Sequence, residues 1–172
     1  HAYTHPYLEA KGFPKHRGEV LDDSLLIRMT DLRGAVVGLQ EIKMVDGEFR
    51  KKFLFGTRAS GAVHQLGREP GAILCEGYAT GLSIRAALDS CPMRARVVIC
   101  FSAGNLVTVA GRLDGDVRIV ADNDASGAGQ KAAEATGKPW VMPPTVGHDA
   151  NDLHRNQGTT AVMAMLMRLR AR

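Results

Sequence analysis

The sequence predicts an α/β protein in which a small β-rich α+β subdomain precedes a parallel sheet flanked by helices. Strands of alternating polarity joined by an Asp-Gly turn indicate antiparallel pairing in the first part of the chain. From Gly71 onward, short apolar runs alternate with helical stretches, which is the order of successive βα units. The segment Leu66–Pro70 separates these patterns and is the most plausible linker. We therefore expect two domains, residues 1–68 and residues 69–172.

The first part contains three expected strands: Ser24–Met29, Val36–Val45 and Glu48–Phe55. Asp46-Gly47 lies between the last two, and this dipeptide favours a two-residue type I′ turn. Such a turn fixes the register of the hairpin, so one face becomes a ladder of mostly charged residues. The expected cross-strand pairs are Val45 with Glu48, Lys43 with Arg50 and Glu41 with Lys52.

The opposite face of this hairpin is mostly apolar, as expected for a side that packs on a core. Its apolar residues are Ile42, Met44, Phe49 and Phe53. Lys51 lies on the same face by the alternation of a strand, although a charged residue is rarely buried without a partner. Lys51 therefore requires a partner or a function of its own.

In the second part, each of three apolar runs is followed by a helical stretch, and such βα units place their strands in a parallel sheet. The runs are Ala72–Gly77, Arg96–Phe101 and Val117–Asp122, and the helices are Thr80–Ser90, Asn105–Leu113 and Gly127–Thr136. A fourth short strand is expected at Pro139–Met142, before a loop at Pro143–Asn156. The chain then closes on a helix at Thr160–Arg170. The apolar stripe of this helix consists of Val162, Leu166 and Leu169.

Composition and charge exclude several classes of protein. The 172 residues are 45% hydrophobic and 23% charged, which is typical of a globular chain rather than a disordered or fibrous one. No apolar run approaches the ~20 residues that span a bilayer, and no secretory signal is present, so we expect a cytoplasmic protein without a membrane partner. The 3 cysteines form no C-x-x-C pair, which argues against a zinc ribbon. The net charge of +4 permits a polyanionic partner without requiring one.

Acidic residues follow the strands of the predicted parallel sheet, where open α/β proteins bind their ligands. Glu76 directly follows one apolar run, and Asp122 and Asp124 follow another. Residues two apart in an extended segment point the same way, so these two aspartates converge beside Glu76 if their strands are neighbours. Asp149 and Asp152 follow the last expected strand and form a further acidic group.

Clustered carboxylates repel one another unless a cation lies among them or their pKa values rise. Hard oxygen ligands suit Mg²⁺ or Mn²⁺, and two such ions about 3.5 to 4 Å apart suit phosphoryl transfer. The sequence therefore favours a metal site with the candidate ligands Glu76, Asp122, Asp124, Asp149 and Asp152. The structural alternative is that Glu76 and Asp122 only cap helices or end strands.

Three motifs resemble those of the Toprim domain, the metal-binding catalytic domain of bacterial-type primases, topoisomerases and some nucleases. They are CEGYATGLS at Cys75–Ser83, ADNDASGAG at Ala121–Gly129 and HDANDLH at His148–His154. The combination of EGxxTGLS with DND is most similar to the primases of phages, plasmids and mobile elements. Segments upstream resemble the small subdomain that precedes Toprim in those primases, at His5–Phe13, Asp31–Ile42 and Lys51–Gly67. The resemblance implies a Rossmann-like Toprim sheet in the catalytic core of a DNA primase.

The resemblance also implies a role for each acidic residue. Glu76 matches the motif glutamate, which acts as a general base or as a metal-linked activator of the attacking hydroxyl. Asp122 and Asp124 match the DxD metal ligands, which are catalytic with Glu76. Asp149 best matches the aspartate of the third motif, and Asp152 is the alternative ligand.

Joining nucleotides requires cations that position the phosphates and neutralise their charge. Five basic residues are candidates for binding the template backbone or the incoming triphosphate: Lys43, Arg50, Lys51, Lys52 and Arg58. A solvated hairpin face explains Lys43, Arg50 and Lys52 at least as well. Lys51 is the stronger functional candidate because it lies on the apolar side of the hairpin.

The leading hypothesis is a nucleotidyltransferase, the core of a primase that makes short RNA primers on single-stranded DNA from ribonucleoside triphosphates, using Mg²⁺ or Mn²⁺. By resemblance, a zinc-binding module and a helicase belong to the full-length protein or act in trans. One alternative is a metal-dependent Toprim nuclease, which cleaves strands without incorporating nucleotides. Another is a non-catalytic module that binds a metal or nucleotide without turnover. A generic Rossmann-like nucleotide binder has little support, because no G-x-G-x-x-G follows the first parallel strand.

Overall fold

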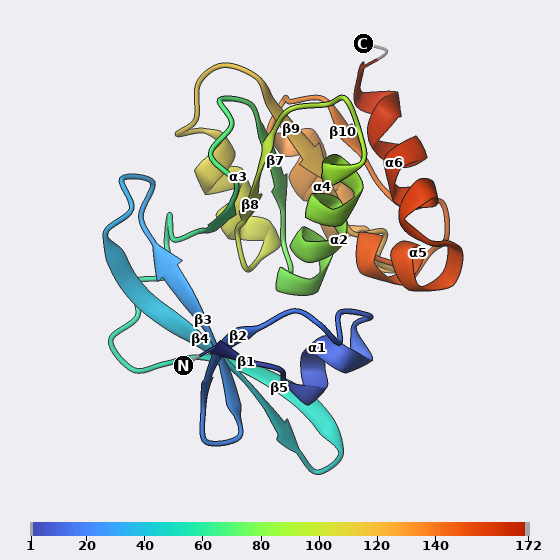
Figure 1. The fold of residues 1–172 in the computed structure, drawn as a ribbon. Coiled ribbons are helices and arrows are strands. Elements are labelled where there is room, and N and C mark those ends of the chain that lie inside the picture. Colours follow the sequence, from blue (N-terminus) through green and yellow to red (C-terminus); the bar gives the residue numbers. More distant parts are fainter. Residues whose placement is uncertain (1, 171–172) are drawn as a thin grey trace. The chain divides into compact units, whose positions relative to one another are not determined.

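The computed structural model describes residues 2–170, which form two compact units that divide between His64 and Gln65. Each unit is built around its own sheet (Figure 1). The predicted α/β class is confirmed, because an antiparallel sheet comes first and a sheet with parallel strands and flanking helices follows. Among residues 2–170, no helix has both the length and the apolar character that a membrane crossing requires.

The first unit is an antiparallel meander with one short helix. Its five strands lie in the order β1-β2-β3-β4-β5, so each strand pairs with the next one along the chain. The elements are β1 (Ala2–Tyr3), α1 (Pro6–Ala10), β2 (Gly18–Leu21), β3 (Ser24–Thr30), β4 (Val36–Val45) and β5 (Glu48–Phe53). Helix α1 begins where the His5 side chain accepts a hydrogen bond from the backbone N–H of Tyr7, at 3.1 Å.

The β4-β5 hairpin has the predicted turn and register. Asp46 and Gly47 both have positive φ angles, 50° and 82°, as a type I′ turn requires. The predicted pairs are present: Val45 with Glu48, Lys43 with Arg50 and Glu41 with Lys52. Strand β5 nevertheless ends at Phe53 rather than Phe55, because the chain turns there and the N–H of Thr57 bonds the carbonyl oxygen of Leu54 at 3.1 Å.

The apolar face of this hairpin is buried only in part. Ile42 is fully buried, but Met44 and Phe53 are 44% and 41% exposed. The expectation that all four apolar residues of this face pack on a core is therefore wrong at these two positions. The partner that Lys51 requires is aromatic: its Nζ lies 5.5 Å from the centroid of the Tyr7 ring. That ring packs edge-on against Phe49, with the ring centroids 5.3 Å apart.

The second unit is a doubly wound layer of strands and helices. Its strands lie in the order β10-β9-β7-β8-β6, and β7 pairs in parallel with both β8 and β9, as β9 does with β10. The elements are β6 (His64–Leu66), β7 (Ala72–Cys75), α2 (Tyr78–Asp89), β8 (Arg96–Ile99), α3 (Ala103–Ala110), β9 (Val117–Val120), α4 (Ala128–Ala135), β10 (Trp140–Val141), α5 (Ala150–Gln157), α6 (Thr159–Met167) and the 3₁₀ turn η1 (Arg168–Arg170).

The winding of this sheet follows from the handedness of its crossovers. The chain passes from β7 through α2 to β8, and then returns across β7 to reach β9 and β10 on the other side. Because such crossovers are right-handed, this reversal puts α2 on one face and α3 and α4 on the other. Helix α2 packs with α5 and α6, whereas α3 packs with α4 (Figure 1). The reversal makes the boundary between β7 and β9 the switch point of the sheet, where open α/β sheets bind ligands.

The expected loop at residues 143–156 contains helix α5 instead. Asp149 and Asp152 form a capping box that starts this helix, and Gly158, with a φ angle of 82°, ends it. Sequence reasoning assigned these two aspartates to a metal site only and so missed the helix start that they encode. The expected helices at the other positions are present, although α2 and α3 each begin two residues earlier than predicted.

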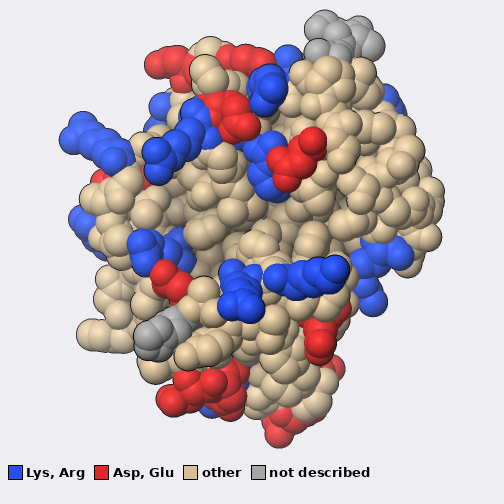
Figure 2. Space-filling view, viewed as in Figure 1, with Lys and Arg blue, Asp and Glu red and all other residues tan. Residues whose placement is uncertain are grey.

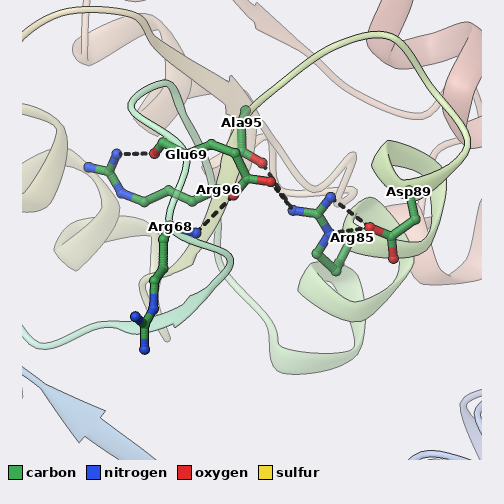
Figure 3. Close-up of polar contacts among 6 residues, drawn as sticks. All are labelled: Arg68, Glu69, Arg85, Asp89, Ala95 and Arg96. Atoms are coloured by element: carbon green, nitrogen blue, oxygen red, sulfur yellow. Dashed lines mark hydrogen bonds and ion pairs between the residues drawn. The ribbon is translucent and has the colours of Figure 1, made fainter.

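The expected linker at residues 66–70 is not a free connection. Leu66 belongs to β6, and Arg96 holds the following residues by donating to the carbonyl oxygens of Glu69 and Pro70, at 2.8 and 2.7 Å. The Glu69 carboxylate in turn accepts from Arg85, at 3.2 Å (Figure 3). Arg85 also bonds the carboxylate of Asp89, 2.7 Å away, so the segment is fixed to both β8 and α2.

We predict that Arg96→Met lowers the free energy of unfolding by about 1 to 3 kcal/mol, because it leaves the two carbonyl oxygens and the Gln65 side chain without their donor. Urea unfolding followed by circular dichroism measures this change. Arg94→Met is the matched control, because Arg94 is exposed and forms no side-chain hydrogen bond or ion pair with any described residue. Equal stability of the two variants would contradict a structural role for Arg96.

Candidate active site

The first two acidic motifs meet at the switch point of the second sheet. Glu76 directly follows β7, and Asp122 follows β9 after one intervening residue. Strands β7 and β9 are parallel neighbours, so their carboxyl ends lie at the same edge of the sheet. The third motif lies close to the first two. Burial raises the pKa of the Cys75 thiol, and the charges of Asp122, Asp149 and Glu76 raise it further.

Glu76 has the properties of a proton acceptor. Its side chain is half-buried, and burial raises the pKa of its carboxyl above the ordinary value. The negative charge of Asp124 raises this pKa further, whereas the backbone N–H of Ala103, in the first turn of α3, lowers it. A carboxylate whose pKa is raised towards neutrality binds a proton more readily in water near pH 7.

Asp124 lies at the N-terminus of α4. Its Oδ1 accepts from the Ser126 hydroxyl and from the N–H of Ala128, at 3.1 Å for the latter, and its Oδ2 accepts from the N–H of Gly129 at 2.8 Å. These hydrogen bonds lower the pKa of Asp124 to about 2, so this carboxyl is ionised at any physiological pH. The amides at the start of α4 therefore bind a carboxylate of the protein itself.

Gly129 allows α4 to approach the backbone of Asp122. A Cβ atom at this position would overlap the carbonyl oxygen of Asp122 and lie 3.1 Å from its carbonyl carbon. One oxygen of the Asp122 carboxylate, Oδ1, is also buried, although the residue as a whole is only half-buried. Packing of the helix against the strand end thus fixes the first aspartate of the DxD motif.

The third motif combines a capping role with free acceptor capacity. Asp149 accepts from the N–H of Asp152 at 2.8 Å, and Asp152 accepts from the N–H of Asp149 at 3.1 Å. One oxygen of each carboxylate is used in this way, and the other forms no hydrogen bond with any residue that the structure describes. Both aspartates therefore cap a helix, and each still has a carboxylate oxygen that can bind a cation.

A backbone bridge joins the second motif to the third. The N–H of Asn123 bonds the carbonyl oxygen of His148 at 3.0 Å, and the N–H of Gly147 bonds the carbonyl oxygen of Asn123 at 2.6 Å. The side-chain amide of Asn123 also donates to the carbonyl oxygen of Pro143, at 2.8 Å. The residue between the two DxD aspartates thus anchors the loop that leads to Asp149.

The carboxylates of the three motifs supply the oxygen ligands that a hard divalent cation prefers. They are not gathered around one point. Within residues 2–170, no three His, Cys, Asp or Glu side chains are placed to hold one ion. The reason is that Asp124 faces the start of α4 and that Asp149 and Asp152 cap α5. The repulsion that raises the pKa of Glu76 comes from Asp124, and a cation between two carboxylates relieves such repulsion.

Sequence reasoning missed a chain of polar side chains that supports the third motif. The buried Asn151 donates to the hydroxyl of Ser83 at 3.1 Å, and that hydroxyl lies 3.0 Å from Nδ1 of His154. Nε2 of His154 lies 3.1 Å from the hydroxyl of Thr159. Burial lowers the pKa of His154, which favours its neutral form. Ser83 lies one helical turn from Thr80 on the buried side of α2. The only signal in the sequence was this pair of polar residues on one face of an expected helix.

The basic candidates all belong to the first unit, and most are paired. Three of them form ion pairs: Lys43 with Asp23 at 2.9 Å, Lys52 with Glu41 at 2.8 Å, and Arg50 with Asp46 at 3.5 Å. Arg58 is exposed and forms no ion pair with a described residue. On the face that Figure 2 shows, Lys and Arg side chains are interspersed with Asp and Glu.

A family model described as the Toprim domain matches residues 71–160, more than half of the 172-residue chain. The chain belongs to the Toprim family. This confirms the resemblance stated for its three motifs. Every acidic candidate lies within the matched segment of the Toprim chain.

Solved structures of DNA primases share the fold of this Toprim chain. A DnaG catalytic core matches with a TM-score of 0.60 and 16% identity, over 94% of this chain and 58% of that one. A DnaG primase catalytic domain bound to ssDNA matches at 0.58 and 16%, over 97% and 55%. A DNA primase domain from Pseudomonas aeruginosa matches at 0.54 and 18%, over 96% and 55%. The Toprim chain thus spans little more than half the length of these relatives, and at such identities the likeness concerns the fold.

Proposed function

We propose that this chain is the catalytic core of a DNA primase, which joins ribonucleotides into short primers on single-stranded DNA by metal-dependent nucleotidyl transfer during replication. The observation that carries the proposal is the extent of the fold match. The Toprim family model covers residues 71–160, but the primase structures match 90% or more of the chain, so the antiparallel first unit is included. We assign the chain to the cytoplasm, where a bacterial-type primase works beside its DNA.

In this proposal the acidic residues divide the work between proton transfer and ion binding. Glu76 accepts the proton of the attacking 3′-hydroxyl, and burial, which raises the pKa of its carboxyl, makes it a stronger base than an exposed glutamate. Asp122 and Asp124 hold Mg²⁺ or Mn²⁺ with Asp149, and Asp152 is the alternative third-motif ligand. The bound ion would supply positive charge to the triphosphate oxygens. To bind the ion, Asp124 gives up hydrogen bonds that it accepts from N–H groups at the start of α4.

The proposal also assigns partners. The single-stranded template and the ribonucleoside triphosphates are the substrates of the reaction. Recognition of particular template sequences and delivery to the replication fork are further tasks of a primase. We assign these tasks to a zinc-binding module and a helicase, either in the full-length protein or in trans.

The decisive experiment incubates the chain with single-stranded DNA, the four labelled ribonucleotides and Mn²⁺ or Mg²⁺, and resolves the products on a gel. Oligoribonucleotides that disappear in an Asp122→Ala, Asp124→Ala variant are expected. Asp114→Ala is the matched control, because it removes an exposed carboxylate elsewhere in the second unit. Shortened DNA without incorporation would overturn the proposal in favour of a nuclease. Retained Mn²⁺ binding without any product, with the other modules added in trans, would favour a binding role.

We predict that Lys51→Ala weakens the use of nucleotides or template more than Arg50→Ala does. Lys51 lies over the Tyr7 ring on the apolar face of the hairpin, whereas Arg50 lies on the charged face and pairs with Asp46. The measurement is KM for the ribonucleotides together with the Kd for single-stranded DNA at two salt concentrations. Equal effects of the two substitutions would remove Lys51 from the binding surface.

A further inference from the structure

A pocket of about 320 Å³ opens beside the edge strand β10 of the second unit. Its described lining includes Trp140, Met142, Pro144, Asn123 and Arg168. This volume lies at the lower end of the range for ligand pockets, about 300 to 1,000 Å³, and suits a group of the size of one nucleotide. None of the roles assigned to the acidic or basic candidates uses this pocket.

The chemistry of the lining points to a planar, partly polar ligand that carries a negative charge. Trp140 is half-buried and contributes an aromatic ring, on which a base of any sequence can stack. Arg168 is exposed and forms no ion pair within residues 2–170, so its guanidinium is available to an anion. Among the described lining residues Arg168 is the only charged one, which suits one phosphodiester better than a triphosphate.

The pocket is connected to the acidic site through Asn123. The amide of Asn123 donates to the carbonyl oxygen of Pro143, which also lines the pocket, and its backbone lies between the two DxD aspartates. Within the described residues this is the one hydrogen bond of the Asn123 side chain, so its Oδ1 and its second N–H are available to the edge of a base. A base in this pocket therefore contacts the residue that lies between the two DxD aspartates in the chain.

The position of Arg168 follows from the end of the chain's last helix. Residue 168 begins the turn η1, which packs against β10 after α6 ends at Met167. The packing depends on buried Leu166 and Leu169, on either side of the exposed positions 167 and 168. The fold thus fixes the backbone of the arginine and leaves its side chain at the pocket.

We propose that this pocket binds one unstacked base of a single-stranded nucleic acid, with the base against Trp140 and the adjoining phosphate on Arg168. The choice of a nucleic acid strand rests on the proposed function, whereas the pocket and its lining do not. The proposal names a strand site that is separate from the basic residues of the first unit.

Trp140 is the only tryptophan of the chain, so its fluorescence reports on this pocket directly. The experiment titrates the chain, without divalent ions, with a ten-nucleotide single-stranded DNA, AMP and ribose 5-phosphate. We expect the strand to change the Trp140 emission and to protect it from acrylamide, AMP to do so more weakly, and ribose 5-phosphate to do neither. An effect as strong with ribose 5-phosphate would mean an anion site only, and tighter binding of AMP would mean a free-nucleotide site. Either result, or no response to the strand, overturns the proposal.

Two variants test the individual contacts. Arg168→Met should reduce the slope of log K against log salt concentration by about 0.7, the value for one phosphate contact on a single strand. Arg112→Met is the matched control, because Arg112 is exposed just beyond the end of α3 and does not line the pocket. Trp140→Leu should weaken binding of a labelled strand by about 5- to 150-fold, and Trp140→Phe by less, as measured by fluorescence polarisation.

These readouts separate the pocket from the proposed function, because none of them needs catalysis. If the chain binds the strand at Trp140 but makes no primers, the pocket proposal stands and the proposed primase function is wrong. If the chain makes primers but the Trp140 emission does not respond to the strand, only the pocket proposal is wrong.

Discussion

Glu76→Gln is expected to lower primer synthesis by about 10²- to 10⁴-fold, the usual contribution of a general base, and at the same time to make the ion-free chain more stable. The stability gain has an electrostatic cause. Burial and the charge of Asp124 raise the pKa of Glu76 in the folded state, so ionised Glu76 destabilises the fold. Glutamine has the same shape without the charge.

The sign of the pH dependence follows from the raised pKa. The folded chain binds the Glu76 proton more tightly than the unfolded chain, so stability falls as the pH rises from the unfolded pKa through the folded one. The stability difference between wild type and Glu76→Gln should therefore vanish at acid pH, where Glu76 is protonated, and be fully present above its folded pKa. Primer synthesis by the wild type should also fall as the pH drops, because the protonated base is inactive, but its midpoint should lie below the folded pKa of the ion-free chain, since a bound cation favours the ionised carboxylate.

Urea unfolding at several pH values in the presence of a chelator measures the first effect, and ribonucleotide incorporation measures the second. Glu134→Gln is a suitable control, since this glutamate is exposed on α4 and bonds only Gln130 among the described residues. A loss of activity with a loss of stability would mean that Glu76 is a structural residue. Unchanged activity would remove it as the base.

The parts of the fold that were predicted correctly depend on short-range rules. The Asp46-Gly47 turn fixes the β4-β5 register because two residues with positive φ allow only one hairpin geometry. The convergence of Glu76 with Asp122 and Asp124 was expected only on the condition that their strands are neighbours, and β7 and β9 are parallel neighbours in the sheet. The turn needs no information from distant parts of the chain, whereas the strand order could not be predicted from local patterns.

The parts that were missed depend on contacts between distant residues or on residues with two roles. Arg96 fixes the expected linker through carbonyl oxygens 26 and 27 residues away, and no local pattern encodes that contact. Asp149 and Asp152 match a metal motif and a capping box equally well, so assigning the first role concealed helix α5. The direction of Asp124 could not be predicted either, because its hydrogen bonds depend on where α4 begins.

Gly129→Ala is expected to disturb the site without touching any acidic side chain. The added Cβ would overlap the carbonyl oxygen of Asp122, and backbone atoms on both sides leave no flexible group that can yield. We expect a loss of about 1 to 3 kcal/mol in the free energy of unfolding, the usual cost of overpacking. Because α4 must move away from the strand end, Asp122 is displaced, and a shift of about 1 Å costs about 10²-fold in rate.

The matched control for this prediction is Gly104→Ala in helix α3. A Cβ at Gly104 meets nothing within 4 Å, so alanine there should raise the free energy of unfolding by up to about 1 kcal/mol through its helix propensity, with primer synthesis unchanged. Both variants are compared by urea unfolding and by ribonucleotide incorporation at a temperature where each is fully folded. If Gly129→Ala matches Gly104→Ala in both measurements, the close approach of α4 does not fix Asp122. A rate loss that persists in folded Gly129→Ala would instead mean that the position of the DxD backbone, as well as its charge, limits the reaction.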